Sequence, residues 1–406
     1  MLHRHALGQL PPKPHTAFYE DGKLLMEQMV TRGGFHGAFS ILYYRTPPTD
    51  EVEVADFSLP GFCPAELVAD QPLKRRHVRT QELKPGGDFL SGRRTLLVGD
   101  NLDIGVCKPV EQTTRFFSNG DGDELYFVKQ GSGTLESLYG VLPFREHDYL
   151  LIPKMTPYRL RFDGPGATLL VFEGRPEISI PSDYRNAWGQ LNDFAPYSHR
   201  DFRMPMELLR LSPAQHGQPP YEIVMKRRNA LTLHRYPHFP LDIAGWDGCM
   251  YPVAFNIHDY QPKTGLVHLP PTIHTTFSGK DFVICSFVPR LLDYHEHAIP
   301  CPYAHANVDM DEILYYVAGN FTSRRGIDSE SISLHPAGVT HGPHPGTYEK
   351  SIGVKRTDEL AVMADCYSAL RLTVEACRLE DRDYHLTWTQ PGEINRAAER
   401  QSWRPE

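Results

Sequence analysis

The sequence predicts a mainly β protein built from two similar β units. Its 35 prolines are spread along the chain, and no segment keeps an apolar period of 3.6 residues over several turns, which argues against long helices. Short strand-like runs instead follow one another in two series, separated by Gly, Asp and Pro turns at the spacing of β-hairpins. This arrangement is typical of a β-sandwich or barrel, and 406 residues are enough for two such domains.

An irregular stretch separates the two series. The first series comprises residues 39–45, 94–107, 124–144, 148–154, 158–162 and 167–174, and the second comprises 281–290, 312–323, 331–336, 348–356 and 359–367. Residues 177–205 and 207–218 are less regular and are expected to be partly helical, as is the polar end of the chain. We therefore expect an N-terminal β domain with this linker at residues 1–270 and a C-terminal β domain at residues 271–406.

The composition excludes several classes of function. The 42 basic and 50 acidic residues give a net charge of −8, and no basic run marks nucleic acid or an anionic membrane as a partner. The most apolar windows are too short to cross a bilayer, and the opening "MLHRHALGQLPPKPH" lacks an apolar signal core, so we expect a soluble, cytoplasmic protein. No nucleophile elbow, P-loop or dinucleotide-binding motif occurs in a strand-to-helix setting.

One motif occurs twice with a difference that bears on function. "FSNGDGDELYFVKQG" (117–131) and "HANVDMDEILYYVAG" (305–319), which we call the first and second copies, share Asn, Asp, Glu and Gly at the same positions. The first copy begins with Phe117, where the second begins with His305. Only the second copy therefore keeps a histidine ahead of its glutamate.

A second motif, P-x-G-x-x-H, follows the second copy. It ends at His341 in "HPAGVTH", whereas the matching "IPKMTPY" of the first copy ends at Tyr158. The second copy thus offers two imidazoles and one carboxylate, from His305, Glu312 and His341. This set suits a mononuclear Fe(II) that must leave one face open to oxygen and substrate, whereas four thiolates or carboxylates would favour zinc or calcium. The alternative is loop histidines beside a surface glutamate.

Several longer stretches carry a resemblance to known proteins. The paired motifs resemble those of the cupin superfamily, and "PYAHANVDMDE", "LHPAGVTHGPHPGTYEKS", "FNIHD", "HALGQLPPKPHTAF" and "GGFHGAFSILYYRTPPT" resemble the homogentisate 1,2-dioxygenase family, particularly a bacterial branch. The resemblance implies two cupin-like units, the N-terminal one without metal ligands. It also implies an Fe(II) enzyme that opens homogentisate with O2 to maleylacetoacetate in tyrosine and phenylalanine catabolism. Members form trimers that pair into hexamers, so a homo-oligomer is expected.

The resemblance also implies roles for individual residues. The family's iron ligands fall on His305, Glu312 and His341, its acid or base histidine falls on His258, and a further active-site histidine falls on His335. Ring opening starts from a phenolate, so a nearby group able to take a proton near neutral pH is needed, and histidine suits this task. His258 could instead be an ordinary turn residue, and His335 could instead orient His341.

The substrate pocket departs from the family pattern at one position. Phe321 stands where many members have a tyrosine thought to contact substrate, nine residues after the ligand glutamate. Tyr316, Tyr315, Arg324 and Arg325 remain as candidates for contacts that would compensate. Two alternatives to homogentisate cleavage therefore stay open. One is cleavage of another hydroquinone or hydroxylated aromatic acid, and the other is a metal-binding cupin without turnover.

The repeat favours a duplicated β unit in which one copy scaffolds and the other reacts. The first copy keeps the Asp, Glu and Gly positions of the shared pattern, while Phe117 and Tyr158 replace the ligands and are expected to fill a core in place of a metal. This hypothesis predicts one iron per chain.

Overall fold

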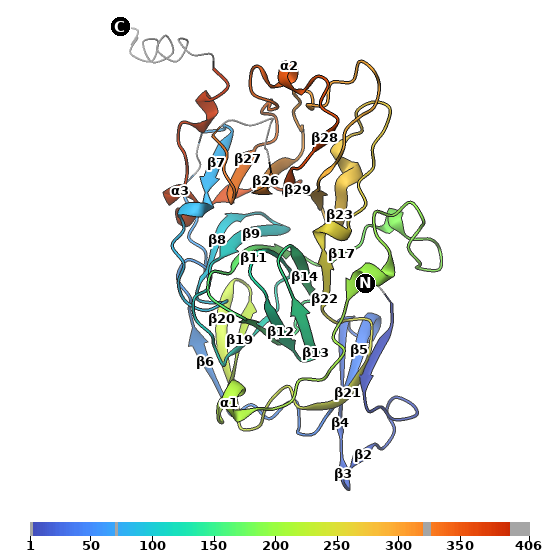
Figure 1. Cartoon of the computed structure of the whole chain (residues 1–406). Helices are drawn as coiled ribbons and strands as arrows, with labels where there is room; N and C mark the ends of the chain where they lie inside the picture. The colour runs from blue at the N-terminus through green and yellow to red at the C-terminus, as the bar shows by residue number, and fades with distance from the viewer. Residues whose placement is uncertain (1–2, 70–71, 320–325, 390–406) are drawn as a thin grey trace.

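β-Sheets make up most of the molecule, as the sequence predicts (Figure 1). The computed structural model describes residues 3–69, 72–319 and 326–389. Within these ranges the α-helices have only four or five residues, namely α1 (Pro213–His216), α2 (Thr347–Ser351) and α3 (Val374–Arg378). In the same ranges, no helix has the length and apolar character needed to cross a membrane.

The first β unit consists of two sheets that enclose a buried apolar cluster. The eight-stranded sheet has the order β18 (Phe202–Arg203), β22 (Val253–Asn256), β14 (Asp148–Ile152), β11 (Asp123–Gln130), β16 (Thr168–Gly174), β9 (Leu102–Cys107), β8 (Arg93–Val98) and β30 (Arg371–Leu372). The facing sheet has the order β13 (Gly140–Phe144), β12 (Gly133–Ser137), β15 (Tyr158–Phe162), β10 (Phe116–Asn119), β19 (Tyr221–Arg227), β20 (Ala230–Tyr236) and β6 (Glu53–Phe57).

The second β unit is built on a seven-stranded sheet. Its order is β7 (Arg76–Arg79), β27 (Ser331–His335), β26 (Asp311–Ala318), β29 (Leu360–Cys366), β24 (Phe282–Phe287), β23 (Thr275–Gly279) and β17 (Ile178–Ser179). A separate sheet joins β1 (His5–Gly8), β21 (Ile243–Gly248), β5 (His36–Tyr44) and β4 (Met26–Gly33). Two short pairs join β2 (Tyr19–Glu20) to β3 (Lys23–Leu24) and β25 (Arg290–Leu291) to β28 (Arg356–Thr357).

The two units exchange edge strands. β7 precedes the first unit in sequence but pairs with β27 of the second, and β17 follows the first unit but pairs with β23 of the second (Figure 1). In return, β22 pairs with β14 and β30 pairs with β8 in the eight-stranded sheet. From β22 to β30, the eight-stranded sheet therefore has the same strand order as the sheet of the second unit from β7 to β17. Each sheet is completed by strands that lie outside its own unit in sequence. The domain division at residue 270 stays a prediction, and a cut there would remove β7 and β17 from the second sheet.

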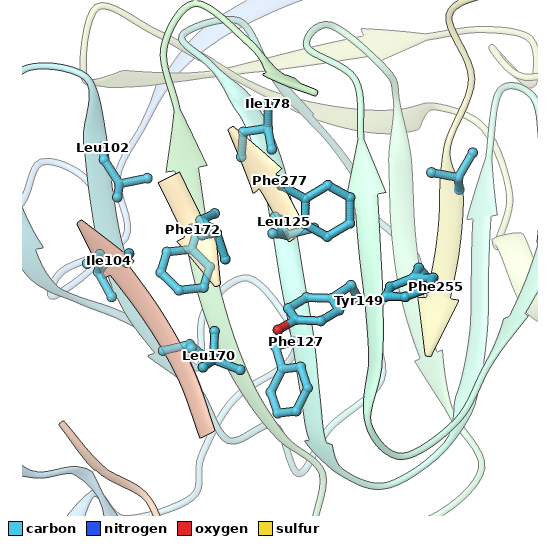
Figure 2. Close-up of a cluster of buried hydrophobic side chains, with 14 of the residues drawn as sticks. Leu102, Ile104, Leu125, Phe127, Tyr149, Leu170, Phe172, Ile178, Phe255 and Phe277 are labelled. Carbon is cyan, nitrogen blue, oxygen red and sulfur yellow. The ribbon is translucent and has the colours of Figure 1, made fainter. Parts of the chain in front are cut away.

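The largest apolar core lies between the eight-stranded sheet of the first unit and the sheet of the second unit. Strand side chains alternate between faces, so Leu125 and Phe127 of β11 point toward this core while Tyr126 points into the first unit. Figure 2 shows Leu125 and Phe127 with neighbours from other strands, including Phe277 of β23. Both faces of β11 are thus buried, which explains its nearly continuous apolar sequence.

Matched contacts support the duplication. Phe117 pairs with Tyr158 across β10 and β15, as His305 pairs with His341 in the second copy. The shared aspartate is structural, because Asp311 accepts hydrogen bonds from the backbone of Ala337 (2.7 Å) and Leu370 (2.8 Å). Asp123 accepts the matching bonds from Lys154 (2.7 Å) and Ile178 (2.9 Å). In both copies this carboxylate holds the loop of the second motif and the segment beside the exchanged strand.

The shared glycine has a backbone reason. Gly131 and Gly319 end β11 and β26 with φ of +98° and +93°, a region that disfavours side chains. A Cβ on Gly319 would lie 2.2 Å from the Asp358 carbonyl oxygen.

Several elements differ from the sequence predictions. The predicted strand at 348–356 is wrong, because α2 occupies Thr347–Ser351 and only Arg356–Thr357 pair as β28. The polar run "TYEKS" has no apolar alternation to support a strand, and the Ser351 hydroxyl instead bonds to the Tyr348 carbonyl (2.8 Å). The strands β19 to β22 were not predicted. The predicted strand at 312–323 ends at Ala318, and residues 320–325 and 390–406 lie outside the described ranges.

Candidate metal centre

His305, Glu312 and His341 converge at one end of the second sheet. Glu312 lies on β26, and the two histidines come from the loops before β26 and after β27. The backbones of His305 and His341 form a β-bridge, in which the N–H of each residue donates to the carbonyl oxygen of the other (2.8 Å). One ligand atom from each side chain lies within 4.8 Å of the others. The two motifs thus bring these side chains together, and their role as iron ligands stays a prediction.

The hydrogen bonds around this group leave a place for a cation. Nδ1 of His305 lies 3.2 Å from the Tyr303 carbonyl oxygen, and Nδ1 of His341 lies 3.0 Å from the Val339 carbonyl oxygen. Each Nδ1 therefore carries the proton, and each Nε2 presents a lone pair. These nitrogens lie 3.6 and 3.4 Å from the carboxylate oxygens of Glu312. Acceptors that face one another repel, so the donor set fits a divalent cation, and two imidazoles with one carboxylate suit Fe(II).

His335 supports the ligands from behind. It lies opposite Glu312 in the β26–β27 register, and its Nδ1 lies 2.7 Å from Oε1 of that carboxylate. Its buried ring stacks on His341 at 4.3 Å between centroids. These are the contacts of a residue that orients metal ligands, the alternative that the sequence left open. Its predicted contact with substrate stays a prediction.

A second carboxyl group lies beside Glu312. Burial alone would raise the pKa of Glu312, but the hydrogen bonds that His305, His335 and His341 donate when they are protonated outweigh it and hold that pKa well below the usual range. Asp365 lies opposite Glu312 on β29, and burial together with the Glu312 charge raises the pKa of Asp365 to about 7. Two carboxyl groups thus lie beside one another, and a bound metal ion would relieve their repulsion.

Solvent reaches the inner face of the second sheet around this group. On the central strands β24, β26 and β29, the inner-face residues that are partly exposed are Val283, Phe287, Leu314 and Asp365. At the positions that match Leu314 and Asp365, the first unit has the fully buried Tyr126 and Glu173. These positions of the second unit are therefore more exposed to solvent than the matching positions of the first.

His258 makes its side-chain contact with another histidine. It is an exposed residue in the short 3-10 helix Ile257–Asp259, after β22 of the eight-stranded sheet. Its Nε2 lies 2.8 Å from Nδ1 of His147, in the turn between β13 and β14. Among the described residues, no contact joins His258 to the His305–Glu312–His341 group, so its catalytic role stays a prediction without support from these contacts.

Another histidine, which the sequence analysis did not single out, lies near the group. The His268 ring packs edge-on against the Tyr303 ring (5.2 Å), and the Tyr303 ring in turn lies 6.3 Å from the His305 ring. Nδ1 of His268 lies 3.7 Å from Oδ2 of Asp293. The loop sequence "LVHLPP" carries no periodic or motif signal, so only the fold brings this residue to the site.

The remaining substrate-binding predictions divide between buried and undescribed residues. Tyr316 lies on the same face of β26 as Glu312, but it is buried and its hydroxyl lies 3.1 Å from the Ser333 hydroxyl. Phe321 lies outside the described residues, as do Arg324 and Arg325. A substrate contact by any of these side chains stays a prediction.

The first copy holds a side-chain cation against its glutamate. Glu124 matches Glu312 and binds both the Arg93 guanidinium and the Tyr158 hydroxyl. The Tyr158 hydroxyl also lies 2.6 Å from the Tyr126 hydroxyl. Arg93 thus neutralises the retained carboxylate, while aromatic rings fill the surrounding space. The sequence hypothesis had not included this arginine.

Comparisons with known proteins show what this chain is similar to. A family model described as the C-terminal part of homogentisate 1,2-dioxygenase matches residues 250–393. A protein of Saccharolobus solfataricus, provisionally named a dioxygenase, is 38% identical over 391 residues, covering 96% of this chain and 99% of its own length. A homogentisate 1,2-dioxygenase of Rhodopseudomonas palustris is 25% identical over 74% of this chain and 70% of its own length. A solved cupin barrel protein from Leptotrichia buccalis covers 75% of this chain and 99% of its own, with 9% identity and a TM-score of 0.31.

Proposed function

Because the chain belongs to the homogentisate 1,2-dioxygenase family, with its cupin fold, we propose that it is an Fe(II)-dependent enzyme that cleaves the ring of homogentisate. Both atoms of O2 enter the product, maleylacetoacetate. The observation that carries this proposal is the convergence of three metal-ligating side chains, whose ligand atoms lie within 4.8 Å of one another. We also infer a homo-oligomer, a trimer or hexamer, from the family resemblance, and light scattering of the purified protein tests it.

The proposed centre uses His305, Glu312 and His341 as ligands. When bound there, Fe(II) would bring O2 and the phenolic oxygen of the substrate together, on the face that the three side chains leave open. His335 would keep the Glu312 carboxylate and the His341 ring in the orientation that binding requires, since it contacts both. The partly exposed inner face beyond them supports a substrate that enters from solvent.

We infer that His268 handles the phenolic proton. Its ring is linked to the ligand His305 through Tyr303, and Asp293 lies close enough to hold its orientation and stabilise its protonated form. A phenol that gives up its proton beside the metal group needs such an acceptor. His258 remains the candidate from family resemblance, and its partner His147 belongs to another part of the structure.

Oxygen consumption tests the proposal. Protein loaded anaerobically with Fe(II) receives homogentisate, with gentisate, hydroquinone and homoprotocatechuate in parallel. Rapid uptake with homogentisate, together with maleylacetoacetate formation, is the expected result. Uptake with only one of the other compounds would mean that this compound, and not homogentisate, is the substrate. No uptake by iron-loaded protein would favour a metal-binding cupin without turnover. His268→Ala and His258→Ala are compared at equal iron content, and the proposal expects His268→Ala to lower turnover at least about 100-fold and more than His258→Ala does. The opposite ranking would return the role to His258.

A further inference from the structure

The strand register in the sheet of the second unit gives the length of its inner face. Glu312 pairs with Asp365, and Asp365 pairs with Val283, so these three residues share one level near the proposed metal. Four residues further along β24, Phe287 points to the same face. At about 3.3 Å per residue, these two levels lie roughly 13 Å apart. The inner face is therefore long enough for an aromatic ring and a side arm.

Arg290 places a cation near Phe287, at the level far from the proposed metal. Its guanidinium carbon lies 5.4 Å from the centroid of the Phe287 ring, so the side chain turns back over that inner-face residue. His274 lies against the same ring at 4.6 Å. The Arg290 guanidinium donates to the Val288 carbonyl oxygen (3.2 Å) and forms no ion pair within the part of the chain that the structure describes. Arg290 is half-buried, so part of it remains accessible to a ligand.

The surroundings of Arg290 favour an anion. Burial lowers the pKa of the Arg290 guanidinium, and the attraction of the more distant Glu359 and Asp293 offsets this loss only in part. Burial, followed by the charges of Arg290 and His268, lowers the pKa of His274 to about 3, so this neighbour is neutral and does not compete for an anion. A partly desolvated cation without a direct partner is costly unless a ligand supplies the opposite charge.

We propose that Arg290 binds the carboxylate of an aromatic acid whose phenolic end lies at the His305–Glu312–His341 group. This inference rests on the proposed function and deepens it by naming the residue that selects acidic substrates. The planar guanidinium presents paired donors that match a carboxylate, and its position over Phe287 places the substrate ring between the two levels. A neutral hydroquinone would leave Arg290 without an anion, so the site discriminates by the cost of an unpaired charge.

Anaerobic binding tests Arg290 separately from catalysis. Fe(II)-loaded wild type, Arg290→Gln and Arg290→Lys are titrated without O2 with homogentisate and with methylhydroquinone, which lacks the carboxylate. Arg290→Gln should weaken homogentisate binding about 10- to 100-fold and change methylhydroquinone binding less than about twofold. Arg356→Gln is the matched control, because Arg356 lies on the adjacent β28 opposite Leu291 and is exposed, and it should bind both compounds like the wild type.

Two results would overturn the inference. One is equal weakening of both compounds, or of neither, in Arg290→Gln. The other is a wild type that binds homogentisate no better than methylhydroquinone. If Arg290→Gln does not fold, Arg290→Lys decides, because losing the paired donors should still lower the preference for the acid, and an unchanged preference refutes the role. Wild type that binds the acid through Arg290 but consumes no O2 would refute the proposed function alone.

Discussion

Replacing Arg93 by methionine should destabilise the protein by about 3–5 kcal/mol, the usual cost of removing one partner from a buried ion pair. The side chains of Arg93 and Glu124 are only 4% and 1% exposed, so solvent cannot take over the role of the guanidinium. Glu124 would keep its bond to Tyr158 but lose its cation. We expect this cost because the Arg93 cation takes, in the first copy, the place of the metal charge that we propose for the second.

Urea denaturation of three variants measures this effect. Arg93→Met is compared with Arg93→Met/Glu124→Leu, in which both charges are absent, and the double variant should regain most of the lost stability because apolar replacements of buried pairs are often neutral. Arg378→Met is the control, since its partner is the nearby Glu375 in an exposed pair and its loss should cost less than about 1 kcal/mol. A cost for Arg93→Met below about 1 kcal/mol, or a double variant as unstable as the single one, would refute the reasoning.

Three further predictions concern the metal and the exchanged strands. Purified protein reconstituted with Fe(II) should hold one iron per chain by elemental analysis, and a value near two would contradict the division of roles between the copies. Fe(II) should raise the melting temperature of wild type but not of Glu312→Gln, because ligand binding to the native state stabilises it and this variant lacks the anionic donor. A fragment of residues 271–406 should fail to fold, since it lacks β7 and β17 at the two edges of its sheet, and a cooperative unfolding transition of that fragment would contradict this.

The features that sequence reasoning found are those written in short contiguous strings. The two motifs place His305, Glu312 and His341 together because each lies within a few residues of one strand end, and the bridge between the two loops follows from that local geometry. The shared Asp and Gly positions were recognisable for the same reason. Their physical purpose, bonds such as that from Leu370 to Asp311, became visible only in the fold.

The features that it missed depend on contacts between distant parts of the chain. Leu334 of β27 pairs with Arg76 of β7, more than 250 positions earlier, and no local pattern specifies that partner. His268 likewise lies in a proline-rich loop, and only the packing of its ring on Tyr303 brings it to the site. The predicted strand at 348–356 failed because its evidence was the spacing of turns, while its side chains lack the alternation that a sheet face requires.

If the first copy descends from a metal site like the one proposed for the second, the contacts of its retained glutamate account for a fold that persists without the metal. Replacing the histidines by Phe117 and Tyr158 removes the metal's other donors but leaves Glu124 buried at 1% exposure. A buried carboxylate requires a counter-charge, so loss of the metal is compatible with folding only if a cation such as Arg93 takes its place. Arginine brings bulk as well as charge, and it closes the interior. The second copy has histidines at these positions, and its inner face stays partly exposed, as the proposed contact between Arg290 and a substrate requires.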